Sequence, residues 1–367
     1  MRIVYGTPSY SPRIGGVEYV AKSVAERLAK MGHEVTVITG EPEAEKPREE
    51  EINGVRVIRW PTWAPSGAYH IPKERDQLRN LLQKLLNDAD AVHVHSAHAV
   101  LTVWAAAAAR RINPDVRIVF TPHYHGTGHS ALRRLLWIPW RRYVARAVEA
   151  ADAIHAVSPR EAGLIKSHYS QAGGKVAIIP NGVGEDVFNH RRRGAHSDYM
   201  MYAGRVERYK RLEVAVDLAR ELGLRLLVVG RGPHREKLRR YARRRRAAVE
   251  FLDPLPRPDY LRLLAGARYA VNPSRQEAYS IFVAEALAMG VPAVVTPEVA
   301  CRGEETPRRQ PGGRRPCRGP CLARCPTEIP RSLPPVMADV DKVVKVPCRC
   351  RGTEKEFTYI RFRLEKV

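Results

Sequence analysis

Two glutamates lie eight residues apart at an expected strand-to-helix junction, and their types and spacing suit the binding of a polar ligand. Glu277 falls on the loop before an expected helix of residues 281–289 and Glu285 on its second turn, with Ser280 as the N-cap and Gly290 as the stop signal. The first backbone N–H groups of a helix lack partners and attract anions. Two carboxylates beside an anion site predict a ligand with hydroxyl groups at both ends and phosphate between them, which is the layout of a sugar nucleotide. The alternative is that Glu277 only caps the helix and Glu285 is a solvated surface residue.

Further segments follow a fixed order along the chain. The two glutamates are followed by Ala286-Leu287-Ala288-Met289-Gly290-Val291-Pro292, and four earlier segments accompany them: Gly15-Gly16-Val17-Glu18, Thr121-Pro122-His123, Pro180-Asn181-Gly182-Val183 and the stretch from Tyr202 to Lys210. Together they resemble the retaining glycosyltransferases called glycosyl transferases group 1, which have the GT-B fold. The likeness runs from Met1 to about Pro297 and is followed by an unrelated tail.

The resemblance implies transfer of a sugar from a nucleotide-diphosphate sugar to a hydroxyl acceptor by front-face substitution. Such a transfer ionises an anomeric C–O bond, so charge on the leaving diphosphate must be stabilised. The family places two cations there, one carboxylate on the hydroxyls of the transferred sugar and a histidine that reaches this sugar from the N-terminal domain. The catalytic residues implied are Arg205, Lys210, Glu277 and His123.

The resemblance also implies a binding set for the nucleotide sugar. The acid at position 285 would hold the ribose, and the first glycine loop would let its backbone approach the phosphates or the acceptor. The binding residues implied are Gly15, Gly16, Arg205, Lys210, Ser280, Ile281 and Glu285. No metal and no cofactor besides the sugar donor are expected, although Asp88-Ala89-Asp90 and Asp339-Val340-Asp341 match the Asp-x-Asp pattern of metal-dependent transferases.

Strand and helix segments alternate through both halves, which is typical of parallel sheets covered on both faces. The expected strands are residues 2–5, 34–39, 54–60, 91–95, 116–121, 153–157, 176–179, 199–203, 224–229, 249–252, 269–272 and 292–296. The predicted fold class is α/β of the GT-B type, with two doubly wound Rossmann-like domains facing a cleft and the second one incomplete. The expected parts are an acceptor-side domain at 1–183, a linker at 184–198, a nucleotide-sugar-binding domain at 199–300 and a tail at 301–367.

The chain is strongly basic, with a formal net charge of +23. Such a charge fits phosphate-rich substrates, an anionic membrane surface or nucleic acid. Because the arginine runs have little aromatic interleaving, no specific nucleic-acid binding is expected. No apolar run is long enough to span a membrane and residues 2–5 already form a strand, so neither a signal peptide nor a transmembrane helix is expected and the protein is predicted to be cytoplasmic.

Cations alternate with large apolar groups between Leu132 and Tyr143. The part from Trp137 to Tyr143 could dock on the inner membrane surface and approach a lipid-linked acceptor, or it could be a buried helix kinked at Pro139. The acceptor could equally be a glycan or a small molecule. Two other functions stay open: a transferase remnant that binds nucleotide sugar without turnover, and a basic nucleic-acid-binding protein.

The tail differs in composition from the rest of the chain. It contains all six cysteines, namely Cys301, Cys317, Cys321, Cys325, Cys348 and Cys350. A zinc module is one interpretation. The preferred one is a reading-frame change near residue 297 that leaves a disordered or loosely packed tail and an exposed sheet edge after residues 292–296.

Overall fold

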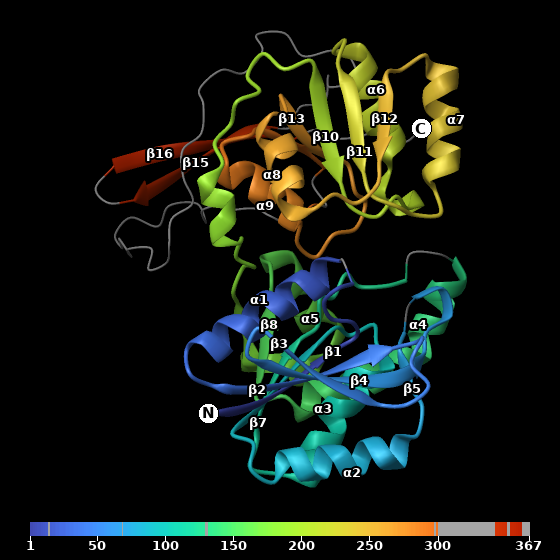
Figure 1. The fold of residues 1–367 in the computed structure, drawn as a ribbon, viewed down its shortest axis with the longest axis vertical. Coiled ribbons are helices and arrows are strands. Elements are labelled where there is room, and N and C mark those ends of the chain that lie inside the picture. Colours follow the sequence, from blue (N-terminus) through green and yellow to red (C-terminus); the bar gives the residue numbers. More distant parts are fainter. Residues whose placement is uncertain are drawn as a thin grey trace. The chain divides into compact units, whose positions relative to one another are not determined.

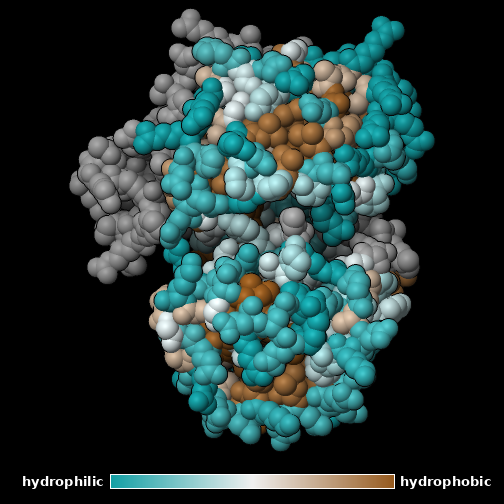
Figure 2. Space-filling model, in the orientation of Figure 1, coloured by the Kyte–Doolittle hydropathy of each residue, from teal (hydrophilic) through white to brown (hydrophobic). Residues whose placement is uncertain are grey.

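The chain forms two compact units, Met1–Asn181 and Gly182–Val367. The computed structural model describes residues 1–13, 15–67, 69–128, 131–296, 299, 342–350 and 353–361. None of the helices in these ranges is long and apolar enough to cross a membrane. Hydrophilic residues cover most of the face shown in Figure 2, as the high proportion of charged residues leads one to expect.

The first unit is built on a mainly parallel sheet with the strand order β3-β4-β2-β1-β6-β7-β8-β9. Two antiparallel pairs, β3 with β4 and β4 with β5, complete one side of it. The strands are β1 (Arg2–Thr7), β2 (Glu34–Glu41), β3 (Arg48–Ile52), β4 (Val55–Trp63), β5 (Ile71–Pro72), β6 (Ala91–His95), β7 (Arg117–Thr121), β8 (Ala153–Ala156) and β9 (Val176–Ile178).

Helices cover both faces of this sheet because neighbouring residues of each strand point to opposite faces. In β1, Tyr5 joins a buried cluster with Ala21 of α1, whereas Val4 joins another with Leu78 of α2. The helices are α1 (Gly16–Lys30), α2 (Arg75–Leu86), α3 (Val100–Ile112), α4 (Ala131–Ala150) and α5 (Pro159–His168). Short 3-10 turns, η1 (Pro65–Gly67) and η2 (Ser170–Lys175), complete the unit.

The second unit repeats the plan with the strand order β12-β11-β10-β13-β14-β16-β15. Its strands are β10 (Tyr199–Ala203), β11 (Arg225–Val229), β12 (Val249–Leu252), β13 (Tyr269–Asn272), β14 (Ala293–Val295), β15 (Lys342–Cys350) and β16 (Thr353–Arg361). Its helices are α6 (Leu212–Glu221), α7 (Arg235–Arg245), α8 (Arg257–Ala265) and α9 (Ile281–Ala288), with the 3-10 turns η3 (Glu185–Asn189) and η4 (Arg208–Lys210). Tyr202 packs with residues of α6 and α7, and the preceding Met201 packs with residues of α8 and α9. The prediction of α/β units with doubly covered parallel sheets is therefore confirmed.

The last two strands correct part of the expectation for the tail. β16 pairs in parallel with β14, so β14 is not the edge of its sheet. β15 pairs antiparallel with β16, and the two strands lie side by side in Figure 1. The valines at 343, 344 and 346 and the aromatic and β-branched residues from 357 to 360 favour extended structure, a propensity that outweighs the surrounding charge. The origin of the tail in a reading-frame change stays a prediction, since residues 301–341, with four of the cysteines, lie outside the described ranges.

Other segments also differ from the expected organisation. The stretch 184–198, expected as a linker, lies in the second unit, where Val187 is fully buried and Arg192 donates its backbone N–H to the carbonyl of Met289 at 2.9 Å. α4 spans Ala131–Ala150 and continues through Pro139. The polar strand β3 escaped prediction because its Arg-Glu-Glu-Glu run has no apolar alternation.

Candidate functional site

Lys210 and Glu277 meet at the carboxyl ends of two neighbouring strands of the second unit. Lys210 ends η4, which follows β10, and Glu277 lies on the loop after β13. The Lys210 Nζ atom donates to Glu277 Oε2 at 2.5 Å, and both side chains are largely buried. Burial alone would lower the pKa of Lys210, but the charge of Glu277 and the phenols of Tyr202 and Tyr209 outweigh it, so the pKa is raised. The pair is therefore a fixed, charged ammonium next to a carboxylate.

Two glycines shape the loop that leads to Lys210. Gly204 follows β10 with a φ of +147°, which only glycine adopts readily. Gly230, after β11, has a φ of +136°, and a Cβ atom there would stand 2.1 Å from the carbonyl oxygen of Gly204. The two loops can pass this close because Gly230 has no side chain. The Gly230-Arg231-Gly232 stretch thus has a packing role.

Arg205, the other predicted cation, points to a different partner. Its guanidinium pairs with Glu207 at 2.7 Å, and its side chain is 62% exposed. The structure therefore brings Lys210 and Glu277 together, while Arg205 remains at the surface of the same loop. A flexible exposed arginine can change partner at small energetic cost, because surface ion pairs contribute only about 0–1 kcal/mol.

Ser280 is the N-cap of α9, as predicted from the sequence. Its Oγ accepts the backbone N–H of Val283 at 3.4 Å and the Nδ2 amide of Asn272 at 2.9 Å. The Ser274 hydroxyl donates to the Oδ1 atom of the same Asn272 side chain at 2.6 Å. The end of β13, the glutamate-bearing loop and the start of α9 are thus fastened to one another. This fastening fixes the direction of the N–H groups that begin at Ile281.

Glu285 is buried within α9 and is held by this chain's own donors. Arg257 Nη1 donates to Glu285 Oε1 at 2.6 Å, and the Tyr260 hydroxyl donates to Oε2 at 2.5 Å. Burial raises the pKa of Glu285, while Arg257 and Tyr260 oppose the increase. Arg257 also binds Asp186 of η3, with its Nε 2.7 Å from Oδ2. Sequence reasoning missed Arg257 and Tyr260, because a cation and a phenol near the start of an ordinary helix carry no recognisable pattern.

In the first unit, His123 follows β7 and lies among several other histidines. Its backbone has a φ of +47°, uncommon for a residue with a side chain, and its Nε2 atom is 3.0 Å from Nδ1 of His95. The His95 ring is fully buried and contacts the Tyr5 hydroxyl through Nε2. Burial lowers the pKa values of His93, His95 and His123, so these rings are neutral at pH 7. Residues 93 and 95 fall within the expected strand 91–95, but the sequence did not reveal this contact.

Glu161 supports the loop that carries His123. It is 1% exposed and accepts backbone N–H groups from both Tyr124, next to His123, and Val157, at the end of β8. Burial raises the pKa of Glu161 to about 7, and the two backbone hydrogen bonds oppose the increase. A sequence signal was available, since Ser158-Pro159-Arg160-Glu161 has the spacing of a capping box with proline at N1.

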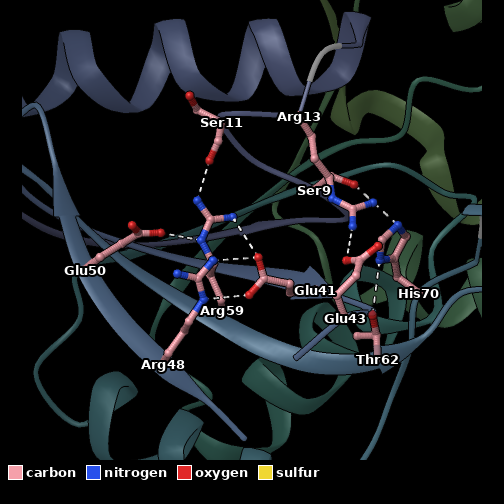
Figure 3. A network of polar contacts seen from close by, with 10 residues as sticks. All are labelled: Ser9, Ser11, Arg13, Glu41, Glu43, Arg48, Glu50, Arg59, Thr62 and His70. Carbon is pink, nitrogen blue, oxygen red and sulfur yellow. Dashed lines mark hydrogen bonds and ion pairs between the residues drawn. The ribbon is translucent and has the colours of Figure 1, made fainter. Parts of the chain in front are cut away.

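The predicted glycine loop begins at the end of β1. Gly15 is the N-cap of α1 in extended conformation. Apart from the chain neighbours of Gly16 and the backbone of its own helix, no described atom lies within 4 Å of a Cβ atom built at Gly16. The segment before it is braced by the polar network of Figure 3. There the buried guanidinium of Arg59 contacts Glu50 and the carbonyl of Ser11, and the His70 ring lies between the hydroxyls of Ser9 and Thr62 at 3.3 Å each.

α4 carries the segment that was expected either at a membrane or in the core. In the structure some of its apolar side chains are buried and others are exposed. Trp137 is buried, and Trp140 donates its ring N–H to the carbonyl of Ala97 at 2.8 Å. Leu135, Leu136 and Ile138 are between 54% and 66% exposed. The two tryptophans therefore belong to the fold, and the exposed apolar groups lie just before and between them.

The Asp-x-Asp pattern at residues 88–90 is used within the fold. Asp88 pairs with the Arg2 guanidinium at 3.1 Å, and Asp90 accepts the Arg2 backbone N–H at 2.6 Å. No group of three or more potential metal ligands is found in the residues that the structure describes. The second Asp-x-Asp pattern, at residues 339–341, and the cysteines between 301 and 325 lie outside them.

Comparison with known proteins identifies the family. Residues 14–187 match the family described as Glycosyltransferase Family 4, and residues 197–309 match Glycosyl transferases group 1. The second match extends past residue 297, where the sequence alone placed the end of the likeness. Among curated proteins, the chain is 24% identical over 318 residues to a D-inositol 3-phosphate glycosyltransferase of Paenarthrobacter aurescens, covering 77% of this chain and 76% of that protein. It is 24% identical over 317 residues to a GDP-mannose-dependent alpha-mannosyltransferase of Mycobacterium tuberculosis, with coverage of 84% and 82%.

Solved structures agree on the fold. A sucrose-phosphate synthase from Thermosynechococcus elongatus superposes with a TM-score of 0.63 at 18% identity, covering 82% of each chain. The Anabaena protein Alr3699/HepE, solved in complex with UDP and glucose, gives a TM-score of 0.60 at 16% identity, with coverage of 82% of this chain and 81% of that one. These likenesses confirm the GT-B fold class that the sequence predicted.

Proposed function

The chain belongs to the group 1 glycosyltransferases, with a family 4 domain in its first part, and on that premise we propose that it moves a sugar from a nucleotide-diphosphate sugar to a hydroxyl acceptor with retention of configuration. The observation that carries the proposal is the contact between Lys210 and Glu277 beside the start of α9. It unites a charged ammonium, a carboxylate and unpaired helix N–H groups at the carboxyl ends of parallel strands, where such sheets bind ligands.

Lys210 is suited to the leaving diphosphate. Because that group gains negative charge as the anomeric bond breaks, a cation held in place beforehand stabilises the transition state more than the ground state. The exposed Arg205 would leave Glu207 to join it, at small cost. The helix start at Ser280 and Ile281 adds backbone donors for the phosphate oxygens. These groups supply the positive charge that a metal supplies in other transferases, so we propose catalysis without a metal or cofactor.

The two glutamates are assigned to hydroxyl groups at the ends of the donor. Glu277 would accept hydrogen bonds from the transferred sugar while keeping its contact with Lys210. Glu285 uses one site on each oxygen for Arg257 and Tyr260, and a carboxylate oxygen accepts two hydrogen bonds, so each oxygen keeps one site for a ribose hydroxyl. Arg257 favours the ionised form of Glu285 at this buried position, and an ionised carboxylate is the stronger acceptor.

The first unit would contribute His123 to the transferred sugar, and Gly15 and Gly16 to the phosphates or the acceptor. The open space at Gly16 supports this assignment, because no other described segment of the first unit packs against this position. The anomeric C–O bond to the leaving diphosphate breaks while the acceptor oxygen bonds to the same face of the anomeric carbon, and the leaving phosphate takes the proton of the acceptor hydroxyl. This substitution needs no nucleophile from the protein.

We further propose that the acceptor is lipid-linked and that the protein works on the cytoplasmic side of a membrane surface. α4 exposes three apolar side chains, those of Leu135, Leu136 and Ile138. The arginines at positions 142 and 146 of the same helix are also exposed. Exposed apolar groups beside cations are the combination that anionic lipid headgroups attract. The net charge of +23 acts in the same direction.

Incubation with a panel of nucleotide sugars tests the proposal. The account predicts release of nucleoside diphosphate from at least one of them, faster when an acceptor extract of lipids or glycans is added. Binding without release from any donor would instead favour a transferase remnant without turnover. Failure to bind any nucleotide sugar would contradict the assignment of the site.

A further inference from the structure

Tyr5 and His95 stack against each other within the first unit. Both side chains are fully buried, their ring centroids lie 4.8 Å apart at an angle of 28°, and the Tyr5 hydroxyl contacts His95 Nε2. They lie on β1 and β6, which are hydrogen-bonded neighbours in the sheet. The contact is therefore set by the centre of the fold rather than by a mobile loop.

The donors and acceptors from Tyr5 through His95 to His123 can be assigned by starting at the buried Tyr5 hydroxyl. In the described chain, His95 Nε2 is the only hydrogen-bond partner of the Tyr5 hydroxyl. An O–H group that is buried without an acceptor is strongly unfavourable, so Tyr5 donates and His95 Nε2 accepts. A neutral histidine then carries its proton on the other nitrogen, so His95 Nδ1 donates to His123 Nε2 across 3.0 Å. His123 in turn must carry its proton on Nδ1.

A second chain of hydrogen bonds runs beside the first and has its own fixed end. His155 Nε2 must donate to the carbonyl oxygen of Ile179, 2.6 Å away, so His155 Nδ1 accepts from the Thr121 hydroxyl at 3.0 Å. Thr121 then accepts from His93 Nε2 at 2.8 Å. The two chains use separate nitrogens and do not compete for His123.

His123 is held at the open end of the first chain. Its left-handed backbone conformation is maintained from the next residue, since the N–H of Tyr124 is bound by the buried Glu161. The described residues offer no partner for His123 Nδ1, and this atom is not among the buried polar atoms that lack one. It is thus an accessible N–H group in a fixed direction.

We propose that Tyr5 and His95 are positioning residues that hold His123 in the Nδ1–H tautomer, so that His123 meets the nucleotide sugar as a hydrogen-bond donor and does not act as a base. This inference rests on the proposed function for the identity of the ligand. Its structural part, the tautomer, stands without it. The physical basis is that the hydrogen bond made by one ring nitrogen decides which nitrogen carries the proton.

Nitrogen-15 NMR of the full chain with labelled histidine tests the tautomer. The ring signals of His123, identified by their loss in His123→Gln, should show a protonated Nδ1 and an unprotonated Nε2 at pH 7.5. Tyr5→Phe removes the fixed end and should turn this pattern into a mixture of both tautomers. Tyr10→Phe is the matched control, because Tyr10 is equally buried and its hydroxyl has no partner in the described chain. A wild-type His123 protonated on Nε2, or an unchanged pattern in Tyr5→Phe, would overturn the proposal.

Turnover tests the functional part with the same variants. With a nucleotide sugar that the wild type uses, Tyr5→Phe should lower kcat about tenfold, the scale of one well-placed hydrogen bond. Tyr10→Phe should stay within about twofold of the wild type. A changed tautomer with unchanged kcat would refute the role in transfer. If the wild type turned over no nucleotide sugar, the proposed function would fail while the NMR result on the tautomer stood.

Discussion

The ammonium of Lys210 lies 2.5 Å from a carboxylate oxygen of Glu277, although the two residues are 67 positions apart. The loops that carry them are also joined by a backbone hydrogen bond from Arg275 to Tyr209 at 2.9 Å. The pair therefore stabilises the junction of β10 and β13 and also presents the charges that the proposed transfer needs.

These two roles can be separated by mutation. Lys210→Met leaves the Glu277 carboxylate largely buried and unpaired, and should lower the free energy of unfolding by about 3–5 kcal/mol. The double variant Lys210→Met/Glu277→Gln removes both charges and should recover most of that loss without recovering turnover. Urea unfolding followed by circular dichroism, together with nucleoside diphosphate release, measures both quantities. Recovery of turnover in the double variant would show that the pair acts only in folding.

Glu285→Ala should weaken nucleotide binding by at least about tenfold, because it removes a charged acceptor from the ribose and one carboxylate partner from Arg257. Calorimetric titration with nucleoside diphosphates measures the affinity. Glu250→Ala, which removes an exposed glutamate of β12, is the control and should bind like the wild type. Equal nucleotide affinity in both variants would show that the ribose does not bind at Glu285 of α9.

Three desolvated histidines of the first unit make the fold sensitive to acid. The pKa values of His93, His95 and His123 are lowered in the folded chain. Below their unfolded pKa of about 6.5 the unfolded chain therefore binds more protons than the folded chain, and the free energy of unfolding decreases as the pH decreases. The loss should be on the order of 1 kcal/mol per pH unit for each histidine. Urea unfolding between pH 7.5 and 4.5 measures this loss, and stability that is constant over the range would contradict the assignment of neutral rings.

Glu161 acts in the opposite direction in the same experiment. Its pKa is raised to about 7, so its contribution to stability is complete below its unfolded pKa of about 4.5 and is lost as the pH rises through 7. Glu161→Gln should therefore lose stability more steeply than the wild type on acidification, by up to about 3 kcal/mol over the range. His196→Gln, at an exposed histidine, should follow the wild type.

The sequence predicted the alternating strands and helices well because both faces of each sheet are apolar and the helix ends carry recognisable signals. The Ser280 cap and the α9 boundaries follow directly from such local chemistry. Contacts between distant side chains could not be predicted in the same way. The partners of Glu285, the bond from Glu161 to Tyr124 and the contact of Tyr5 with His95 depend on strand order and loop geometry, which a single sequence does not encode locally. β3 and β15 were missed because their charged residues conceal the strand pattern.

The membrane proposal predicts retention of the protein on vesicles that contain anionic lipid at low salt, and release as salt screens the arginines. Ile138→Asp should weaken this retention by opposing burial of the apolar group with a negative charge. Met31→Asp makes the same type of change at an exposed residue that caps α1, and should leave retention intact. Sedimentation with anionic and with neutral vesicles measures it. Equal recovery in the supernatant with both kinds of vesicle would exclude the membrane contact.

The rate of nucleoside diphosphate release in Lys210→Ala tests the central claim most directly. With the donor that the wild type uses best, loss of one electrostatic contact to the leaving group should slow release by on the order of a hundredfold at saturating donor. Lys237→Ala, at an exposed lysine of α7, should match the wild type, and unfolding curves recorded on the same samples confirm that each variant is folded. A folded Lys210→Ala protein that releases nucleoside diphosphate within about twofold of the wild-type rate would contradict the proposed mechanism.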